Sequence, residues 1–567
     1  MADILSRIAK ELSIRQSQVE SAVKLIDEGN TIPFIARYRK EVTGGLDDQI
    51  LRELHDRLVY LRNLESRKEE VRRLIEAQEK LTDEISANLD KAETLQEIED
   101  IYRPFKPKRR TRASIAREKG LEPLAIIIYS QKLIQGDINA LASKYLDEEK
   151  GVTTTEEAIQ GAMDIIAETV SDNAEYRRVI RELTFKEGVI VSSAKKEEDS
   201  PYRMYYDFKE PVNKIAPHRV LAINRGEKEE FLSIKLEAPE ERIIEWLKGK
   251  TISKSGSIFT EIIEKAVEDA YKRLIAPSIE NEIRGILTEA ASEQAIKVFS
   301  ENLRNLLLQP PVKGKIVLGL DPAYRTGCKL AVVNEIGKVL HTDVIYPTPP
   351  QNKVAEAAAT LKALIEKYDV DVIAIGNGTA SRESEIFVAG VIKTLDKKVR
   401  YMVVSEAGAS VYSASKLAAE EFPDFDVSLR SAVSIARRLQ DPLAELVKID
   451  PKAIGVGQYQ HDMNQKRLGE ALSGVVESCV NSVGVDLNTA SPSLLSYVAG
   501  VNSTIANNIV EYREANGGFR TRKELMKVKK LGEKTFEQCA GFLRIPEGDN
   551  ILDNTSVHPE SYEACEK

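Results

Sequence analysis

Apolar residues recur every three or four positions through most of the first 195 residues, which is the spacing of amphipathic helices. The Gly44-Gly45 pair predicts the end of one helix, and the acids that follow it favour the start of the next. A polar connection over 195–208 leads into a second helical block, which we expect to run to about Leu308. The clearest apolar stripe consists of Leu51, Leu54, Leu58, Leu61 and Leu64.

The pattern changes after "QPPVKGK" (309–315), where two prolines predict the end of a helix. Strand-like apolar runs follow, and helical stretches separate or follow the later ones. Strands mixed with helices of this length predict an α/β domain over a largely parallel or mixed sheet. The expected strands are 316–320, 329–334, 338–345, 370–375 and 399–404, and the expected helices are 352–367, 381–395 and 410–420.

From Ala432 the chain is helical again, and two short helix pairs occupy 486–545. Each pair turns through a tight hairpin, at 499–503 and at 530–534. A glycine turn at a helix N-terminus presents backbone N–H groups that can bind a phosphate oxygen, without reading base sequence. Hairpins used only for packing are the alternative, which the tandem repeat of one spacing disfavours. The candidate nucleic-acid contacts are Gly500, Asn502, Arg513, Lys530, Gly532 and Lys534.

A second candidate for nucleic-acid binding is the basic segment, residues 102–120, with eight basic residues and one acid. Clustered cations release counterions from phosphates, and the interleaved Tyr102 and Phe105 could stack on single-stranded bases. The alternative is a solvated loop, or a set of salt bridges to acidic parts of the same chain. The candidate contacts are Arg103, Lys106, Lys108, Arg109, Arg110 and Arg112.

Composition narrows the class of protein. A chain of 567 residues predicts about three to five domains. The net charge of −9 means that any nucleic-acid binding must come from local basic patches. No apolar run approaches a membrane span, and the N-terminal stretch does not resemble a secretory signal. The four cysteines lie far apart with no CxxC pair, which argues against structural zinc and disulfides and fits a cytoplasmic protein.

Two familiar kinds of catalytic motif are missing. Gly249-Lys250-Thr251 looks like the end of a P-loop, but Ile244 stands where the first glycine is required. The five histidines are scattered and His461 has no nearby His or Cys, so neither a metal cluster nor a Ser-His-Asp triad is indicated.

Five stretches between about residues 30 and 545 resemble the Tex family of bacterial transcription accessory proteins. The resemblance implies an RNA- or single-stranded-DNA-binding scaffold near RNA polymerase or the ribosome, away from membranes. The similar stretches are "NTIPFIARYRKEVTGGLDD", "YRPFKPKRRTRASIAREKGLEPLA", "APHRVLAINRGE", "GLDPAYRTG" and "HDMNQKRLGEALSGVVESCVNSVGVDLNTASPSLLSYVAGV".

The resemblance also implies the order of domains. It predicts a mainly helical multidomain chain with one RNase H-like domain of the YqgF type and a tandem helix-hairpin-helix. The expected regions are 1–195 (helical, with a helix-turn-helix-like part), 196–310 (central, helical), 311–455 (YqgF-type), 456–485 (connecting helix), 486–545 (helix-hairpin-helix) and 546–567 (a linker). The chain ends where the family's OB-fold RNA-binding domain is expected.

The hairpins depart from the family's Gly-x-Gly pattern. The first reads Gly500-Val501-Asn502 and the second Lys530-Leu531-Gly532, with one glycine each. Because asparagine tolerates a positive φ, the first turn is compatible with Asn502 in the place of the second glycine.

Nucleases of the RNase H fold use carboxylates around two Mg²⁺ ions. Asp321 ends the first strand, Glu406 follows the last strand, and Asp441 lies at a late helix, so these are the candidate catalytic and metal residues if the domain is active. One observation argues against activity. The active resolvase-type pattern is Asp-x-Gly, and this chain has Ala323 in the place of the glycine. Asp441 before Pro442 could equally be a helix cap. We expect a degenerate site, with Mg²⁺ required only if it is active; a Mg²⁺-dependent nuclease and a protein-interaction platform are the alternative functions.

Overall fold

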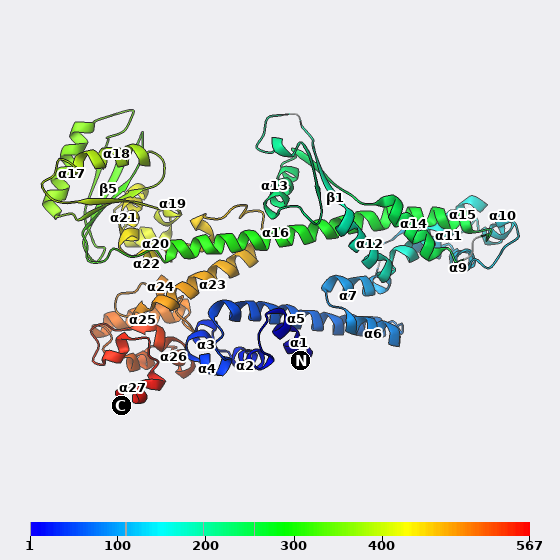
Figure 1. Ribbon diagram of the computed structural model, residues 1–567, viewed down its shortest axis with the longest axis horizontal. Helices are drawn as coiled ribbons and strands as arrows, with labels where there is room; N and C mark the ends of the chain where they lie inside the picture. The colour runs from blue at the N-terminus through cyan, green and yellow to red at the C-terminus, as the bar shows by residue number, and fades with distance from the viewer. Residues whose placement is uncertain (1, 108–109, 197, 254–255) are drawn as a thin grey trace. The chain divides into compact units, whose positions relative to one another are not determined.

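The computed structural model describes residues 2–107, 110–196, 198–253 and 256–567, and the chain forms two compact units (Figure 1). One unit contains residues 1–55 and 295–567, and the other contains 56–294. Two long helices, α5 (Asp48–Glu76) and α16 (Ala276–Leu307), carry the chain from one unit into the other. Within the described ranges, no helix combines the length and the apolar character needed to cross a membrane.

The N-terminal part of the first unit is helical, as the apolar spacing predicts. Gly44 and Gly45 both have positive φ, 65° and 89°, and end α4 where the glycine pair predicted a stop. The five leucines of the predicted stripe lie on α5 and are at most 2% exposed. The helices before α5 are α1 (Ala2–Glu11), α2 (Gln16–Asp27), α3 (Ile32–Tyr38) and α4 (Lys40–Thr43).

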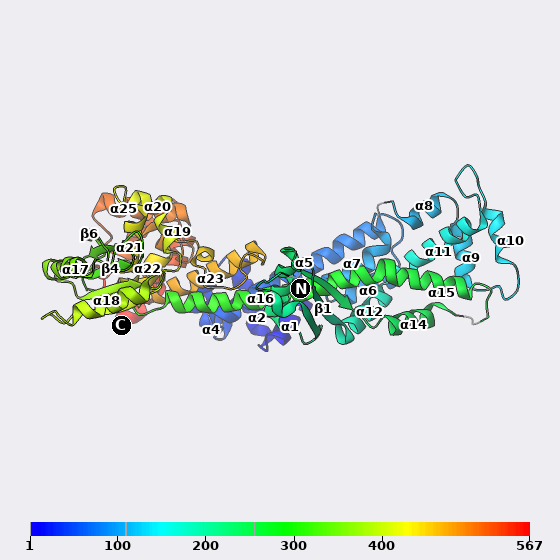
Figure 2. The same ribbon diagram turned by 90° about the horizontal axis from the view of Figure 1, so that it is seen from above.

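The 56–294 unit is built mostly from short helices. Helix α11 (Thr155–Ser171) begins at Thr154, whose hydroxyl accepts the Glu157 N–H at 3.2 Å. In both views it lies beside α9 and α15 (Figures 1 and 2). The other helices are α6 (Asp83–Lys91), α7 (Leu95–Tyr102), α8 (Arg112–Glu118), α9 (Glu122–Ser130), α10 (Ile138–Ala142), α12 (Ala174–Glu187), α13 (Pro217–Lys228), α14 (Glu240–Thr251) and α15 (Thr260–Asp269).

This unit also contains a sheet that the apolar pattern did not predict. The antiparallel strands β1 (Val189–Ala194), β2 (Asp207–Pro211) and β3 (Leu232–Glu237) pair in the order β2-β1-β3. Apolar residues alternate with polar ones in β3, which buries one face, whereas β2 carries three charges in five residues and buries none of them fully. The region 196–310, which we expected to be helical, therefore also contains the strands β2 and β3.

The predicted α/β domain is present, with all five expected strands within two residues of their expected bounds. The sheet order is β6-β5-β4-β7-β8, with β5 antiparallel to both β4 and β6, and β7 parallel to both β4 and β8. The strands are β4 (Val317–Asp321), β5 (Cys328–Val333), β6 (Val339–Ile345), β7 (Val372–Gly376) and β8 (Arg400–Val404).

Helices cover both faces of this sheet. Leu318 and Leu320 face a core shared with α17 (Val354–Tyr368) and α18 (Ser381–Ile392), whereas Val317 faces α21 (Val427–Gln440). Gly319 lets α21 approach closely, since a Cβ there would collide with the Ala432 carbonyl oxygen. The helix expected over 410–420 is two helices, α19 (Ala409–Ser413) and α20 (Lys416–Glu421).

The helix pairs near the C-terminus form one apolar core with α23 (Gln465–Val483) and the end of α16. Helices α24 (Pro492–Leu495) and α25 (Ser503–Asn516) make the first pair, and the 3₁₀ turn η6 (Arg522–Lys527) and α26 (Glu533–Cys539) make the second. The short parallel strands β9 (Val485–Asp486) and β10 (Leu543–Arg544) pair at the two ends of this region.

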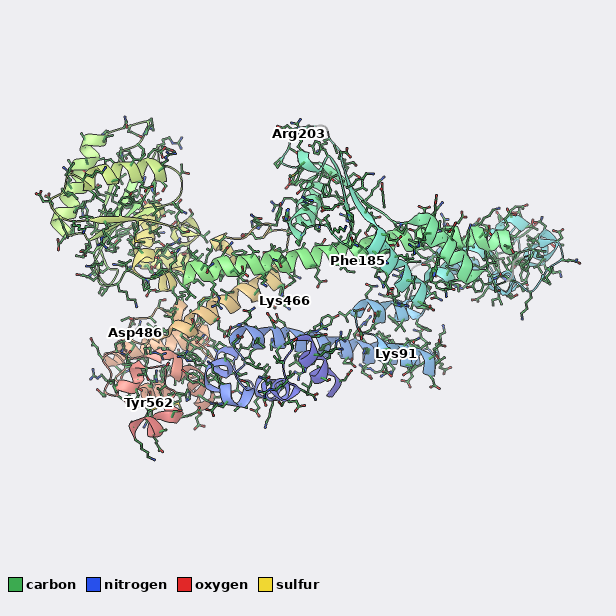
Figure 3. All side chains as sticks on the ribbon, in the orientation of Figure 1. Lys91, Phe185, Arg203, Lys466, Asp486 and Tyr562 are labelled. Carbon is green, nitrogen blue, oxygen red and sulfur yellow. The ribbon has the colours of Figure 1, made fainter. Side chains whose placement is uncertain are left out.

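The polar segment 546–567 packs on the hairpin region, where its composition had predicted a linker. Arg522 is 1% exposed and donates to the Leu543 and Thr555 carbonyl oxygens at 2.7 and 2.6 Å. It also donates at 2.7 Å to the hydroxyl of Tyr562, which is labelled in Figure 3 and begins helix α27 (Tyr562–Glu566). One buried guanidinium thus ties the segment to the fold.

Candidate nucleic-acid interface

The first hairpin turns on Gly500, which has φ of +77°. Val501 points into the core and is 6% exposed. Asn502 has φ of −95° and caps α25, its side chain accepting the Ile505 N–H at 2.9 Å. Asn502 serves as the helix N-cap, which is extended, so the turn does not use the positive φ that asparagine tolerates.

The second hairpin repeats this backbone pattern with different residues. Lys530 takes the left-handed conformation, with φ of 65°, in the position of Gly500. Leu531 is buried at 4% exposure, and Gly532 is the extended N-cap residue of α26. Each turn therefore runs from a positive-φ residue through a buried apolar residue to an extended one, and in the second turn the positive-φ residue carries an exposed ammonium.

The two hairpins pack on each other and on the N-terminal helices. A Cβ at Gly500 would lie 2.8 Å from the Cβ of Gln538 on α26. The Gln538 amide accepts the Thr31 N–H at 2.8 Å and donates to Asn30 Oδ1 at 2.9 Å. Lys534 Nζ donates to the same Asn30 oxygen at 2.8 Å. The lysine is thus held in place at one end of α26.

Arg513, another predicted contact, is engaged in the fold. Its Nη1 donates to the Leu487 and Ala490 carbonyl oxygens at 3.1 and 2.9 Å. Burial lowers the pKa of this guanidinium. These hydrogen bonds hold the turn before α24 in place.

The basic segment lies in the other unit and is partly paired with acids, as its alternative interpretation predicted. Arg103 lies 3.9 Å from Glu282. Lys106 lies 3.4 Å from Glu99, and Arg110 lies 3.8 Å from Glu118. Arg112 is exposed and, among the residues that the structure describes, has no ion-pair partner. Lys108 and Arg109 lie outside the described residues.

The structure brings two of the three candidate carboxylates together. Asp321 ends β4 opposite Lys329 in the β4–β5 ladder, and the Ser431 side chain of α21 lies near enough to act to lower its pKa. Burial raises the pKa of Asp321. Burial, with the nearby Asp321 charge, also raises the pKa of Glu406, which follows β8.

A glycine turn after β7 makes room for Glu406. A Cβ at Gly376 would lie 2.5 Å from Glu406 Oε2, and one at Gly378 would overlap the carboxylate. Asn377 Oδ1 accepts the Glu406 N–H at 3.0 Å. The turn "GNG" therefore fits the Glu406 side chain and its backbone.

Arg438 supplies positive charge to this site and was missed by sequence reasoning. Its Nη1 donates to the carbonyl oxygens on either side of Glu406, those of Ser405 and Ala407, at 2.9 and 2.7 Å. The guanidinium is 3% exposed, and burial lowers its pKa, while Glu406 and Glu445 act to raise it. A helical spacing of three and four residues from Ser431 through Ser434 to Arg438 places all three on one face of α21, which is the signal that could have found it.

Asp441 lies at the other end of α21. It caps the short helix α22 (Pro442–Leu446), accepting the Ala444 N–H at 3.0 Å. The sequence had left open that Asp441 is a helix cap, and this is the role it has. The structure does not bring Asp441 to Asp321. Ser431, ten positions earlier on the same helix, occupies the place beside Asp321.

The residues around Asp321 do not fit the two-metal centre that an RNase H fold implies. The donor set is two carboxylates and a serine hydroxyl, and Lys329 and Arg438 place two cations beside them. Lys329 Nζ is held by the Thr326 and Gly327 carbonyl oxygens. Within the described residues, no group of three or more His, Cys, Asp or Glu side chains is arranged to hold a metal ion.

Four regions of the chain match described protein families. Residues 2–76 match the Tex-like protein N-terminal domain, and 135–299 match the Tex central region. Residues 315–440 match the Tex protein YqgF-like domain, and 480–544 match the helix-hairpin-helix motif. The matches follow the order that the sequence resemblance predicted.

Curated relatives are similar over almost the whole chain. The uncharacterized protein YdcI of Bacillus subtilis is 56% identical over 98% of this chain and 78% of its own length. Protein tex of Bordetella pertussis is 49% identical over 100% of this chain and 74% of its own length. The transcriptional accessory protein Tex of Neisseria gonorrhoeae is 48% identical over 99% of this chain and 74% of its own length. The chain therefore belongs to the Tex family.

Proposed function

We propose that this protein is a transcription accessory scaffold that binds RNA or single-stranded DNA near RNA polymerase in the cytoplasm, without base-sequence preference. The observation that carries the proposal is the repeated hairpin, in which a positive-φ residue and an extended residue precede a helix N-terminus. Such turns aim backbone N–H groups at a phosphate oxygen. Phosphate contacts of this kind fix position on the backbone and read no base.

The cations near the hairpins and in the basic segment contribute to binding in different ways. Lys530 is exposed at the turn itself and is free to meet a phosphate in solution. Lys534 is held by Asn30 and Glu537 beside the turn, which gives it a defined position. Exposed cations of the basic segment, such as Lys106, Arg110 and Arg112, add a second patch in the other unit. Because both patches act through charge, binding is expected to weaken steeply with salt.

The link to transcription comes from the relatives. The Neisseria gonorrhoeae relative is named a transcriptional accessory protein, and a human relative, 37% identical over 96% of this chain and 56% of its own length, is named S1 RNA-binding domain-containing protein 1. We extend the role in transcription to this chain, and we propose its nucleic-acid binding from its own hairpins. A polymerase or ribosome surface is the expected protein partner.

A binding and cleavage assay on the purified chain tests the proposal. Labelled single-stranded RNA, single-stranded DNA and a four-way junction are incubated with the protein in Mg²⁺ or in EDTA. The proposal predicts salt-sensitive binding with intact substrate in both conditions. Mg²⁺-dependent cleavage that is lost in Asp321→Asn would show a nuclease instead, and no binding at low salt would leave a protein-interaction platform.

A further inference from the structure

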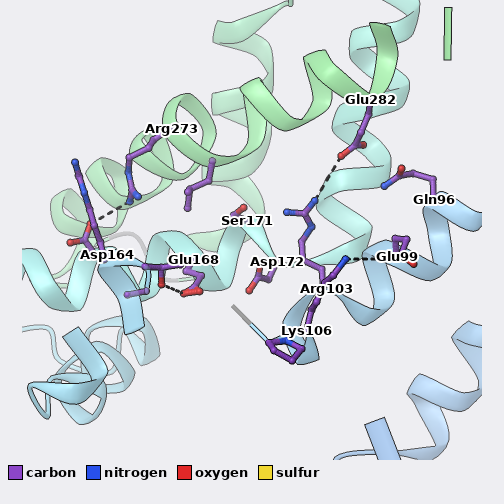
Figure 4. A pocket seen from close by; sticks show the side chains of 15 residues that line it. Gln96, Glu99, Arg103, Lys106, Asp164, Glu168, Ser171, Asp172, Arg273 and Glu282 are labelled. Carbon is purple, nitrogen blue, oxygen red and sulfur yellow. Dashed lines mark hydrogen bonds and ion pairs between the residues drawn. The ribbon is translucent and has the colours of Figure 1, made fainter. Parts of the chain in front are cut away.

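A pocket of about 510 Å³ lies in the 56–294 unit, and the basic segment forms one of its walls (Figure 4). Helix α11 forms a second wall of the pocket. The start of α16 and the turn that precedes α16 form a third wall. A volume of this size is within the range of about 300–1,000 Å³ that small-molecule sites occupy. The proposed nucleic-acid function uses Lys106 and Arg112 as part of an exposed patch and leaves the interior of this pocket unassigned.

The mouth of the pocket is cationic. Arg112 and Lys106 line it and are both exposed. The Lys106–Glu99 pair at 3.4 Å joins exposed side chains, and pairs of that kind contribute little. Burial raises the pKa of Asp164, and the nearby charges of Arg273 and Arg112 act to lower it. Arg112 itself has no ion-pair partner in the described part of the chain. Both cations are therefore available to an anionic group that enters from solvent.

The inner wall is acidic. Asp164, Glu168 and Asp172 are spaced four residues apart and so share one face of α11 and its C-terminal end. Asp164 is 9% exposed and Glu168 is 6% exposed. Figure 4 shows Asp172 on the side of the pocket that faces Arg103. Asp164 is paired with Arg273 and Glu168 with Arg117, each at 3.3 Å. A carboxylate can accept several hydrogen bonds, so the remaining acceptor positions of this wall suit a group rich in O–H or N–H donors.

An irregular helical turn shapes the third wall. The stretch between α15 and α16 is a π-helical turn, η4 (Ala270–Ile275), which carries Arg273 and Leu274 into the pocket lining. Arg273 Nη2 lies 3.3 Å from Asp164. A π-turn interrupts a regular helix and is frequently found at functional sites. This turn lies at the pocket, which is an observation independent of the charges.

The order of charges fixes the chemistry of the occupant. The occupant must place an anionic group at the mouth of the pocket and a neutral group with several hydrogen-bond donors in its interior. A ribonucleoside 5′-phosphate has this form, because its phosphate lies at one end and the 2′- and 3′-hydroxyls, both donors, lie on the ribose. A 2′-hydroxyl is also what distinguishes RNA from DNA.

We propose that this pocket binds a ribonucleoside 5′-phosphate with a free 2′,3′-diol, a proposal that rests on the proposed RNA-binding function where the source is an RNA 3′ end. Arg112 and Lys106 hold the phosphate, and the α11 carboxylates accept hydrogen bonds from the diol. The 3′-terminal nucleotide of a strand and a free nucleoside monophosphate share this chemistry. In the first case the rest of the strand leaves through the cationic mouth along the basic segment.

The experiment compares RNA ends. A 5′-fluorescein single-stranded RNA with a 3′-terminal diol is titrated with the full chain, alongside the same RNA with a 3′-phosphate or with a 2′,3′-dideoxy terminal nucleotide. The diol strand should bind roughly tenfold more tightly, which is the loss expected for hydrogen bonds to a charged group. Unlabelled nucleoside 5′-monophosphates, titrated by calorimetry, form the second arm.

Two variants and two controls locate the effect. Arg112→Gln and Asp172→Asn should abolish the preference for the diol end and weaken monophosphate binding. Lys132→Gln removes an exposed charge of the same unit that does not line the pocket, and Asp199→Asn removes an exposed acid elsewhere in the unit. Both controls should leave the preference unchanged. Circular dichroism of all four variants checks that they fold.

The outcomes separate this proposal from the proposed function. Monophosphate binding that depends on Arg112, without any end preference, supports the pocket and identifies the free nucleotide as its source. Monophosphate binding with no RNA binding at all also supports the pocket and contradicts the proposed function. RNA binding that ignores the end, together with no monophosphate binding, overturns the pocket alone.

Discussion

The carboxylate of Glu406 lies against Gly378, in the space that a side chain at residue 378 would occupy. Gly378 is not in the left-handed region, so the requirement for glycine here comes from this contact. Gly378→Ala must displace Glu406, and overpacking of this kind costs about 1–3 kcal/mol. Thermal unfolding should show a lower Tm for the variant. Gly390→Ala on α18, where a Cβ meets nothing within 4 Å, is the matched control and should be neutral or slightly stabilising. Equal effects at the two positions would contradict the packing account.

Glu406→Gln tests the protonation of the buried carboxylate. Burial and Asp321 raise the pKa of Glu406 above its ordinary value of 4.5, so the folded state holds this proton more tightly than the unfolded state. The wild type therefore loses stability as pH rises from about 4.5 through the raised pKa, and glutamine does not titrate. The Tm of the variant, measured relative to wild type, should increase across that pH range. A difference that stays flat or falls with pH would show that the carboxylate is already ionised at low pH.

Arg513→Gln separates a structural cation from a binding one. The side chain donates two hydrogen bonds to the Leu487 and Ala490 carbonyl oxygens, and its loss leaves both acceptors short of a partner. We expect a loss of about 1–3 kcal/mol in the free energy of unfolding. RNA affinity at a temperature where the variant is folded should change little. A large loss of RNA affinity without a loss in the free energy of unfolding would show that Arg513 contacts the nucleic acid.

Lys530→Gly tests the strained backbone of the second hairpin. A non-glycine residue at φ of 65° costs about 1–2 kcal/mol, and glycine removes that cost. Chemical denaturation should show the variant to be more stable than wild type by about 1 kcal/mol. RNA affinity should nevertheless fall, because the ammonium is gone. Higher stability with unchanged affinity would mean that Lys530 serves only the turn.

The apolar pattern predicts the RNase H-like sheet well because each strand is a run of buried residues. The place of Asp321 and Glu406 also follows from sequence, since both come directly after strands whose ends meet at one edge of the sheet. Asp441 could not be placed in this way. It follows α21, and the ten positions that separate it from Ser431 correspond to about 15 Å along a helix.

The small sheet of the central region escaped prediction for a physical reason. Strand β2 buries none of its residues fully, and its sequence "DFKEP" carries three charges in five positions. Such a strand has no apolar run, and it forms because β1 offers it a hydrogen-bonding edge. Similarly, the residue type of Lys530 does not predict its positive φ. The correspondence between Lys530 and Gly500 becomes visible only when the backbones of the two hairpins are compared.

The central claim is that the hairpins bind the nucleic-acid backbone, and Lys530→Glu tests it most directly. Fluorescence anisotropy measures the affinity of wild type and variant for two single-stranded RNAs of unrelated sequence over a range of salt. Lys416→Glu, with the same change of charge at an exposed site on α20, is the control. The account predicts that Lys530→Glu weakens both RNAs by the same factor and lowers the slope of log affinity against log salt by about 1, with the control near wild type. An affinity for both RNAs that equals that of wild type would contradict it.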